Sequence, residues 1–212
     1  MSATIEGMKR SRILDVVRLG SIVVVLAAIV AQALELLGAG RFDATRFFAY
    51  FTIQSNIIGV VAFAWLLADR GASRARGLDL LRGAAVVYLT VTFFVVIFLL
   101  SDVDVQLQLA WVDFVLHKFF PVVVLLDWII DPPRTRLTAR DAILWLAYPI
   151  VWVVLTLTRG ALDGWYPYPF LDPGDGGYGP VAIAVVAITL GFLLIAGVTI
   201  AIGNARARSV RW

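Results

Sequence analysis

The chain has 212 residues, of which 61% are apolar and only 16% are charged, and its mean hydropathy is +0.89. Soluble globular domains are about 45–50% apolar and about 25% charged, so this composition excludes an ordinary soluble domain. The absence of cysteine excludes disulfides and thiolate metal sites, and a single histidine, His117, excludes bis-histidine haem ligation within the chain. Because the net charge is only +3, we attribute the pI near 9.5 to membrane topology rather than to nucleic-acid binding, and we expect neither a metal nor another cofactor.

Six apolar runs, each close to the length of a bilayer-spanning helix, follow one another along the chain. A helix needs roughly 20 apolar residues to cross a bilayer, and backbone amides in hydrocarbon must be satisfied locally, so helices rather than strands are predicted. Breaks rich in glycine, proline or charge separate the runs, and the longest break, residues 160–179, is predicted to be a loop. The prediction is an all-α integral membrane protein with one six-helix domain over residues 1–212, its helices covering about 13–37, 47–68, 80–100, 109–130, 142–158 and 180–202.

Lysine and arginine are distributed unequally between the two sides of this predicted bundle. Three of them, Arg41, Arg46 and Arg159, fall on the side away from the termini. Under the positive-inside rule, the side with more basic residues in short loops is cytoplasmic. Both termini are therefore predicted to be cytoplasmic, in a multi-pass protein of the cell (inner) membrane, with the loop 160–179 outside. The basic residues on the side of the termini are Lys9, Arg10, Arg12, Arg70, Arg74, Arg76, Arg82, Arg134, Arg136, Arg140, Arg206, Arg208 and Arg211.

The N-terminus also allows a different interpretation. Basic residues, an apolar core and then Ala31-Gln32-Ala33 look like a secretory signal peptide with a cleavage site. The apolar run continues beyond Ala33, however, and removal of one helix would disturb the even number of crossings that the charge distribution favours. We therefore expect this first helix to be retained.

A short pattern recurs where predicted helices begin. Leu14-Asp15-x-x-Arg18 opens the first helix, Leu78-Asp79-x-x-Arg82 opens the third, and Arg140-Asp141 opens the fifth. The spacing suits three stacked helical hairpins. Aspartate near a helix start is also favoured by capping and by the helix dipole, so both interpretations stay open.

Strongly polar side chains are costly inside a membrane helix, and here they gather in two of the predicted helices. The second helix carries Thr52-Ile53-Gln54-Ser55-Asn56, and the fourth carries Asp113, His117, Lys118 and Asp127. Both helices run inward from the outer face, and at a rise of about 1.5 Å per residue Thr52 lies about 8 Å and His117 about 12 Å below the helix starts. The Thr52 hydroxyl and the His117 imidazole are therefore predicted to meet if the two helices pack together.

Helical spacing places further polar residues beside Thr52. Ser55 and Asn56 follow it by three and four positions, so they share its face. Hydrogen-bond donors on Ser55, Asn56 or Gln54 would stabilise an oxyanion in a site of low dielectric. Polar residues of this kind also commonly join membrane helices, and a buried threonine commonly bonds to a carbonyl one turn earlier, so a purely structural role is the alternative.

The fourth helix and the long loop offer supporting residues as well. Asp113 precedes His117 by one turn, where its carboxylate would fix the tautomer of the ring. Pro121 removes the N–H that would bond to the His117 carbonyl and is predicted to bend the helix there. Tyr166 and Tyr168 in the loop fit either a lid over the site or anchors at the membrane interface.

Three motifs in this order carry a family resemblance: Tyr50-Phe51-Thr52-Ile53-Gln54-Ser55-Asn56, then His117 with Pro121, then Tyr168-Pro169-Phe170-Leu171. They resemble the androgen-induced, or androgen-dependent, membrane hydrolase family and its bacterial six-pass relatives. Eukaryotic members of that family are threonine hydrolases that cleave fatty acid esters of hydroxy fatty acids. The resemblance, which extends from the second helix to the last loop, therefore implies a hydrolase with Thr52 as nucleophile and His117 as base; the role expected for Asp113 does not come from this resemblance.

The leading hypothesis is an integral membrane hydrolase of fatty acyl esters whose lipid substrate enters from the bilayer. A threonine hydroxyl becomes an effective nucleophile when a nearby base takes its proton, and a neutral histidine is the usual base. The alternative hypothesis is a small transporter or lipid-binding protein without enzymatic activity. Such a protein would use Asp113, His117 and Asp127 as a polar site within the membrane.

Overall fold

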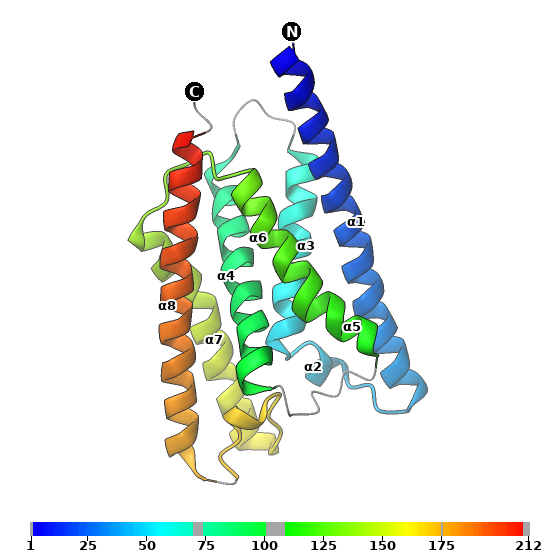
Figure 1. Ribbon diagram of the computed structural model, residues 1–212. Coiled ribbons are helices and arrows are strands. Elements are labelled where there is room, and N and C mark those ends of the chain that lie inside the picture. Colours follow the sequence, from blue (N-terminus) through cyan, green and yellow to red (C-terminus); the bar gives the residue numbers. More distant parts are fainter. Residues whose placement is uncertain (1, 70–73, 101–108, 175, 210–212) are drawn as a thin grey trace.

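The computed structural model describes residues 2–69, 74–100, 109–174 and 176–209, with side chains from residue 12 onward. These described residues form helices and their connections, without any strand. The long helices lie side by side in one bundle (Figure 1). In chain order the elements are α1 (Ser2–Gly38), α2 (Ala44–Phe47), α3 (Phe51–Ala68), α4 (Arg76–Leu99), α5 (Ala110–Phe114), the π-helical turn η1 (Val115–Phe119), α6 (Phe120–Ile130), α7 (Ala139–Asp163), the 3-10 turn η2 (Pro169–Leu171) and α8 (Tyr178–Ser209).

Among the described residues, five helices are long and apolar enough to span a bilayer: α1 from Arg12 onward, α3, α4, α7 and α8. Their outward faces carry large apolar side chains, and Val16, Ile143 and Leu194 are between 67% and 71% exposed. Contiguous apolar surface of this extent requires a cover, and for long helices with apolar outer faces the cover is lipid. The predicted all-helical membrane architecture is confirmed at this level.

The predicted helix over 109–130 is present, but its hydrogen-bond pattern changes midway. α5, η1 and α6 follow one another without a gap from Ala110 to Ile130. Because the π turn interrupts it, neither α-helical part reaches the length of a span. Six crossings and cytoplasmic termini remain predictions. Of the basic residues on which the predicted orientation depends, Arg70, Arg211 and the side chains of Lys9 and Arg10 lie outside the described residues. α1 begins and α8 ends at the same end of the bundle, as an even number of crossings requires (Figure 1).

The helices α3 and α4 lie at the centre of the bundle. α4 contacts α3, α6, α7 and α8, and α3 contacts α1, α4 and η1. Two glycines permit this close packing, since a Cβ atom on Gly59 would lie 2.6 Å from the Phe120 ring and one on Gly83 would lie 2.2 Å from the Trp145 ring. α3, which carries Thr52, is thereby held against η1, which carries His117.

Several helix ends differ from the predictions, and at α7 capping groups rather than the end of an apolar run determine them. α7 begins at a capping box of Thr138 and Asp141 and ends at Gly164, whose φ of +72° suits a left-handed cap. Residues 160–163, predicted as part of the loop, are therefore helical. α1 and α8 extend beyond 13–37 and 180–202 at both ends, and α4 begins before residue 80, because polar residues next to the apolar runs continue the helices; α4 ends at Leu99, one residue before the predicted end.

The helix α1 packs as an integral part of the bundle. It continues without interruption through Ala31-Gln32-Ala33, where the alternative interpretation places a cleavage site. Val25 and Ala28 on this helix are fully buried. The contacts of α1 with α3, α5 and α6 depend on that buried face, and retention of the helix stays a prediction.

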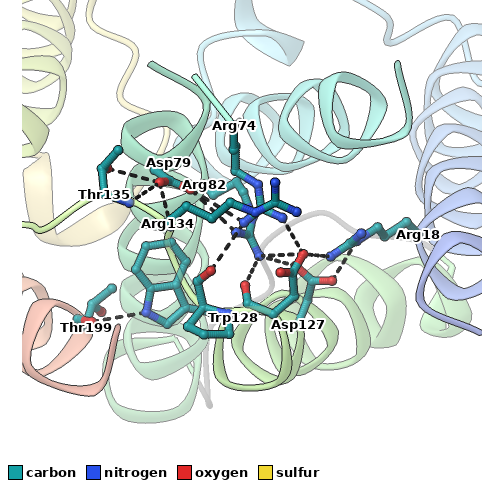
Figure 2. A network of polar contacts seen from close by, with 11 residues as sticks. Arg18, Arg74, Asp79, Arg82, Asp127, Trp128, Arg134, Thr135 and Thr199 are labelled. Atoms are coloured by element: carbon teal, nitrogen blue, oxygen red, sulfur yellow. Dashed lines mark hydrogen bonds and ion pairs between the residues drawn. The ribbon is translucent and has the colours of Figure 1, made fainter. Parts of the chain in front are cut away.

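A network of buried charges joins α1, α4 and α6 on the side of the bundle where the termini lie. Figure 2 shows Arg18 and Arg82 on either side of Asp127, and each donates a hydrogen bond of 2.7 Å to this carboxylate. Asp131 accepts hydrogen bonds of 2.6 Å from Arg18 and from Arg74. Since a buried charge is tolerated when it is paired and hydrogen-bonded, the network requires one relative position of the three helices.

The repeated Leu-Asp-x-x-Arg pattern contributes to this network. Its two arginines, Arg18 and Arg82, bind the same carboxylate. The Asp79 side chain does not cap α4. Its Oδ2 atom instead accepts hydrogen bonds of 2.8 Å from the N–H groups of Arg134 and Thr135, in the connection that follows α6. The pattern therefore serves pairing between segments, and only the third aspartate, Asp141, acts as a capping residue.

Candidate active site

The site lies at the end of the bundle away from the termini, where α2 is followed by α3 (Figure 1). The carboxylate of Asp43 caps α2 by accepting two backbone N–H groups at 2.8 and 3.1 Å. This short helix ends, Tyr50 adopts an extended conformation, and α3 begins at Phe51. The break divides the predicted helix over 47–68 and places Thr52 in the first turn of α3, at the positive end of the helix dipole.

The π turn η1 positions His117. Within it the N–H of Phe120 donates to the carbonyl of Val115, five residues earlier instead of four. Such turns are frequent at functional sites. One additional residue in the turn changes the direction in which its side chains point, and the His117 side chain is buried facing α3.

A hydrogen bond from Asn56 compensates for the π turn. The N–H of Phe120 is bound elsewhere, and the residue five after Leu116 is Pro121, which has no N–H, so the Leu116 carbonyl lacks a donor from its own helix. Asn56 Nδ2 donates to this carbonyl at 3.1 Å and to the Thr52 carbonyl at 2.8 Å. From the sequence, Pro121 was expected to leave the His117 carbonyl without its N–H donor. In the structure it leaves the Leu116 carbonyl without one, and Asn56 binds this carbonyl, because the π turn shifts the hydrogen bonds by one residue.

Thr52, His117 and Asp113 form a hydrogen-bonded series. His117 Nε2 lies 3.2 Å from Thr52 Oγ1, and His117 Nδ1 lies 2.8 Å from Asp113 Oδ1. Because an ionised carboxylate only accepts, Nδ1 carries the proton and Nε2 accepts the Thr52 hydroxyl. Thr52 and His117 are buried, whereas the Asp113 side chain is 27% exposed and also binds Lys118 Nζ at 3.2 Å. A nucleophile, a base and an acid that orients the base is the arrangement found in acyl-transfer enzymes.

Tyr168 completes the surroundings of the Thr52 hydroxyl. Its own hydroxyl lies 3.3 Å from Thr52 Oγ1 and accepts the Thr52 N–H at 3.3 Å. Burial raises the pKa of Tyr168 to about 12, so the phenol keeps its proton at neutral pH. With Nε2 accepting the Thr52 proton, Tyr168 is the donor to Thr52 Oγ1, and it lies where an oxyanion formed at Thr52 would need one.

The other predicted site residues bind elsewhere. Ser55 Oγ donates to the Thr52 carbonyl at 3.0 Å, and Gln54 Nε2 donates to the Phe48 carbonyl at 2.6 Å. The Gln54 side-chain oxygen accepts the Tyr148 hydroxyl and so links α3 to α7. The Tyr166 ring packs against Gly160 on α7, so closely that a side chain at residue 160 would not fit. These groups hold the segments around Thr52 in place and do not face its hydroxyl.

A cavity of about 410 Å³ opens beside Thr52 and His117. Its walls come from the end of α1, the α2–α3 break, η1 and the loop that carries Trp165 and Tyr168. Asp127 is not part of it: ten residues of helix, about 15 Å, separate Asp127 from His117. Within the described part of the chain no three His, Asp or Glu residues are grouped as metal ligands would be.

Comparisons of this chain with protein-family models, with curated proteins and with solved structures find no match. The resemblance to a known family therefore stays an expectation from the three short motifs of the sequence. The chemistry of the site rests on its geometry.

Proposed function

We propose that this protein is an integral membrane hydrolase of fatty acyl esters in which Thr52 is the nucleophile and His117 the base. The observation that carries the proposal is the series Asp113–His117–Thr52 beside a cavity, with each ring nitrogen of His117 within hydrogen-bond distance of its partner. General-base assistance of this kind typically contributes about 10²–10⁴-fold to the rate. The resemblance of residues 50–56 to a family of threonine hydrolases supports the same assignment.

The proposed reaction proceeds in two halves. Thr52 Oγ1 attacks the ester carbonyl carbon while His117 Nε2 takes its proton, and the resulting oxyanion receives the Tyr168 hydroxyl. The bond from carbonyl carbon to the alcohol oxygen then breaks, and His117 returns the proton to that oxygen. Water, activated by His117, hydrolyses the acyl ester on Thr52 and releases the fatty acid.

The proposed placement puts this site in the outer half of the cell (inner) membrane, with both termini in the cytoplasm. Thr52 lies at the end of the bundle away from the termini, and the charge distribution favours cytoplasmic termini. A lipid ester diffusing in the outer leaflet would reach the site without leaving the bilayer.

Labelling of the detergent-solubilised protein with a fluorophosphonate probe tests the assignment. We expect labelling of the wild type and of Thr52→Ser, and loss of labelling in Thr52→Ala and in His117→Ala. Thr158→Ala is the matched control, because Thr158 is exposed on α7 and lines neither of the two cavities next to Thr52, and it should label normally. Undiminished labelling of both Thr52→Ala and His117→Ala would falsify the proposal.

The alternative of a transporter or lipid-binding protein predicts ligand binding without turnover. A polar site built from Asp113, His117 and Asp127 together is not favoured, because Asp127 is bound by Arg18 and Arg82 near the other end of the bundle. Fatty acid release from a neutral ester, dependent on Thr52, separates the two hypotheses.

A further inference from the structure

Another cavity, of about 270 Å³, lies at the end of the bundle opposite to Thr52. One wall is the connection between α6 and α7, with Thr135 and Arg136, and the other is the last part of α8, with Asn204, Ala207 and Arg208. These two segments meet at the end where the chain termini lie (Figure 1). The volume is just below the range of about 300–1,000 Å³ for typical ligand pockets, so the cavity suits a small group rather than a whole lipid.

The backbone that carries Arg136 is fixed by hydrogen bonds on both sides. Thr135 donates to Asp79 Oδ2 through its N–H at 2.8 Å and through its hydroxyl at 3.0 Å. Leu137 donates its N–H to Asn204 Oδ1 at 3.0 Å, and its carbonyl accepts Asn204 Nδ2 at 2.8 Å. Arg136 is therefore held at the cavity without any contribution from its own side chain.

The unused hydrogen-bond donors of this cavity belong to its two arginines. The Arg136 carbonyl accepts Arg76 Nη1 at 3.0 Å, but the Arg136 side chain makes no hydrogen bond or ion pair within the described part of the chain. Within the same residues, Arg208 uses only Nε, which donates to the Asn204 carbonyl at 3.3 Å. The Thr135 hydroxyl and the Asn204 amide are already bonded, so a ligand meets free donors that are cationic.

The walls contain no charge that balances these arginines. No acidic residue is among the described residues that line the cavity. Asp141, at the start of α7, is bound by Arg76 at 2.7 Å and by the Thr138 N–H at 2.7 Å. Guanidinium groups bind phosphate oxygens through paired N–H groups, so two free guanidinium groups favour a phosphate. A headgroup that also carries an ammonium is disfavoured, because the ammonium finds no acid here.

The position of the cavity along α8 places it at the depth of lipid phosphates. α8 ends at Ser209, but its apolar run ends at Ile202. At about 1.5 Å per residue, Asn204 lies about 3 Å and Arg208 about 9 Å beyond Ile202. Each headgroup layer of a bilayer is about 5–8 Å thick, so the cavity lies within that layer.

We infer that Arg136 and Arg208 bind a phosphate ester that carries no cation of its own. The headgroup of an anionic phospholipid and a soluble phosphate ester both supply this group. Basic pockets between membrane helices on the cytoplasmic side bind anionic headgroups, and the charge distribution of the chain predicts that side. The site is independent of the proposed hydrolase, since it shares no residue with the cavity beside Thr52.

Native mass spectrometry of the full chain in a neutral detergent tests this site without any turnover. Phosphatidylglycerol, phosphatidylcholine and glycerol phosphate are titrated separately. Hydrogen bonds to charged groups are worth about 10- to 100-fold in binding, and for exposed arginines we expect about tenfold tighter binding of phosphatidylglycerol than of phosphatidylcholine. That preference identifies a lipid as the source, whereas equal lipid affinities with saturable binding of glycerol phosphate identify a soluble ester. Equal lipid affinities without binding of glycerol phosphate overturn the inference.

Charge variants assign the binding to the two arginines. The double variant Arg136→Gln with Arg208→Gln should abolish the preference for phosphatidylglycerol, or the binding of glycerol phosphate. Arg12→Gln with Arg140→Gln is the matched control, because it removes two exposed charges that do not line the cavity, and it should behave as the wild type. Unchanged binding in the first double variant, or an equal loss in the control, overturns the inference.

A variant that fills the cavity tests its shape while both arginines remain. Ala207→Trp places a large side chain in the cavity and should also abolish the binding. Ala205→Trp, at an exposed position of the same helix outside the cavity, should leave it unchanged. Unchanged binding in Ala207→Trp, or an equal loss in both variants, overturns the cavity as the site.

Discussion

Replacement of Asp113 by asparagine tests how much the carboxylate behind His117 contributes to the proposed reaction. When His117 takes the Thr52 proton the ring becomes positively charged, and the carboxylate, 2.8 Å from Nδ1, stabilises that charge. Asparagine keeps nearly the same shape and loses the negative charge. We therefore expect kcat to fall in Asp113→Asn.

The size of the effect follows from the geometry. The imidazolium charge is spread over the ring, and two unit charges about 4 Å apart at an effective dielectric constant of about 20 interact by about 4 kcal/mol. The Asp113 side chain is 27% exposed and shared with Lys118 at 3.2 Å. Solvent and this second cation reduce the interaction to about half, or about 2 kcal/mol, which corresponds to a decrease of about 30-fold in kcat.

The assay is the initial rate of fatty acid release from a neutral ester, measured at saturating substrate with the rate of fluorophosphonate labelling in parallel. Lys118→Gln is the matched control, since it removes the competing cation and leaves Asp113 in place, and its kcat should equal or exceed that of the wild type. A thermal unfolding midpoint in detergent close to that of the wild type shows that Asp113→Asn is folded. A kcat within threefold of the wild type in this folded variant refutes the reasoning.

Three other expectations concern the bundle. Asp127→Asn leaves two buried arginines without their shared carboxylate and should lower the free energy of unfolding in mixed micelles by about 3–5 kcal/mol. The double variant Arg82→Met with Asp127→Leu should recover part of this loss. Equal stability of the wild type and Asp127→Asn would contradict the expectation. Burial alone would raise the pKa of Asp131, but the surrounding arginines hold it below its usual value, so its contribution to stability is present above about pH 4 and is lost as the pH falls through its folded-state pKa. Unfolding midpoints measured from neutral to acidic pH should therefore decline less in Asp131→Asn than in the wild type, and parallel curves would argue against it. Since the chain has no cysteine, single replacements report orientation: in intact cells an impermeant maleimide should label Gly174→Cys and not Ala139→Cys, and the reverse pattern would invert the predicted topology.

The pairing of Thr52 with His117 could be predicted because it depends on quantities that a sequence contains. The rise of a helix per residue is nearly constant, and the direction of each helix follows from the number of preceding crossings. These two facts placed both side chains at similar depth. Their atoms lie 3.2 Å apart in the structure.

The detailed surroundings of the pair could not be predicted, because they depend on rotation about helix axes and on contacts between distant segments. Asn56 shares a face with Thr52, as expected, yet it donates to the Leu116 carbonyl across the helix interface. That carbonyl is available only because of the π turn. Tyr168, 116 residues after Thr52, reaches the hydroxyl through the path of a loop for which periodicity gives no information.

Composition and hydropathy by themselves determined that this is an all-helical membrane protein, because the cost of an unsatisfied backbone amide in hydrocarbon leaves few other solutions. The spacing of polar residues also predicted which two helices carry Thr52 and His117, the pair proposed to react. The tertiary structure decided where the helix capped by Asp43 ends, how η1 turns His117 towards α3, and that Arg18 and Arg82 share one carboxylate. These features depend on packing and electrostatic pairing across the bundle, which arise only when segments far apart in the chain are brought together.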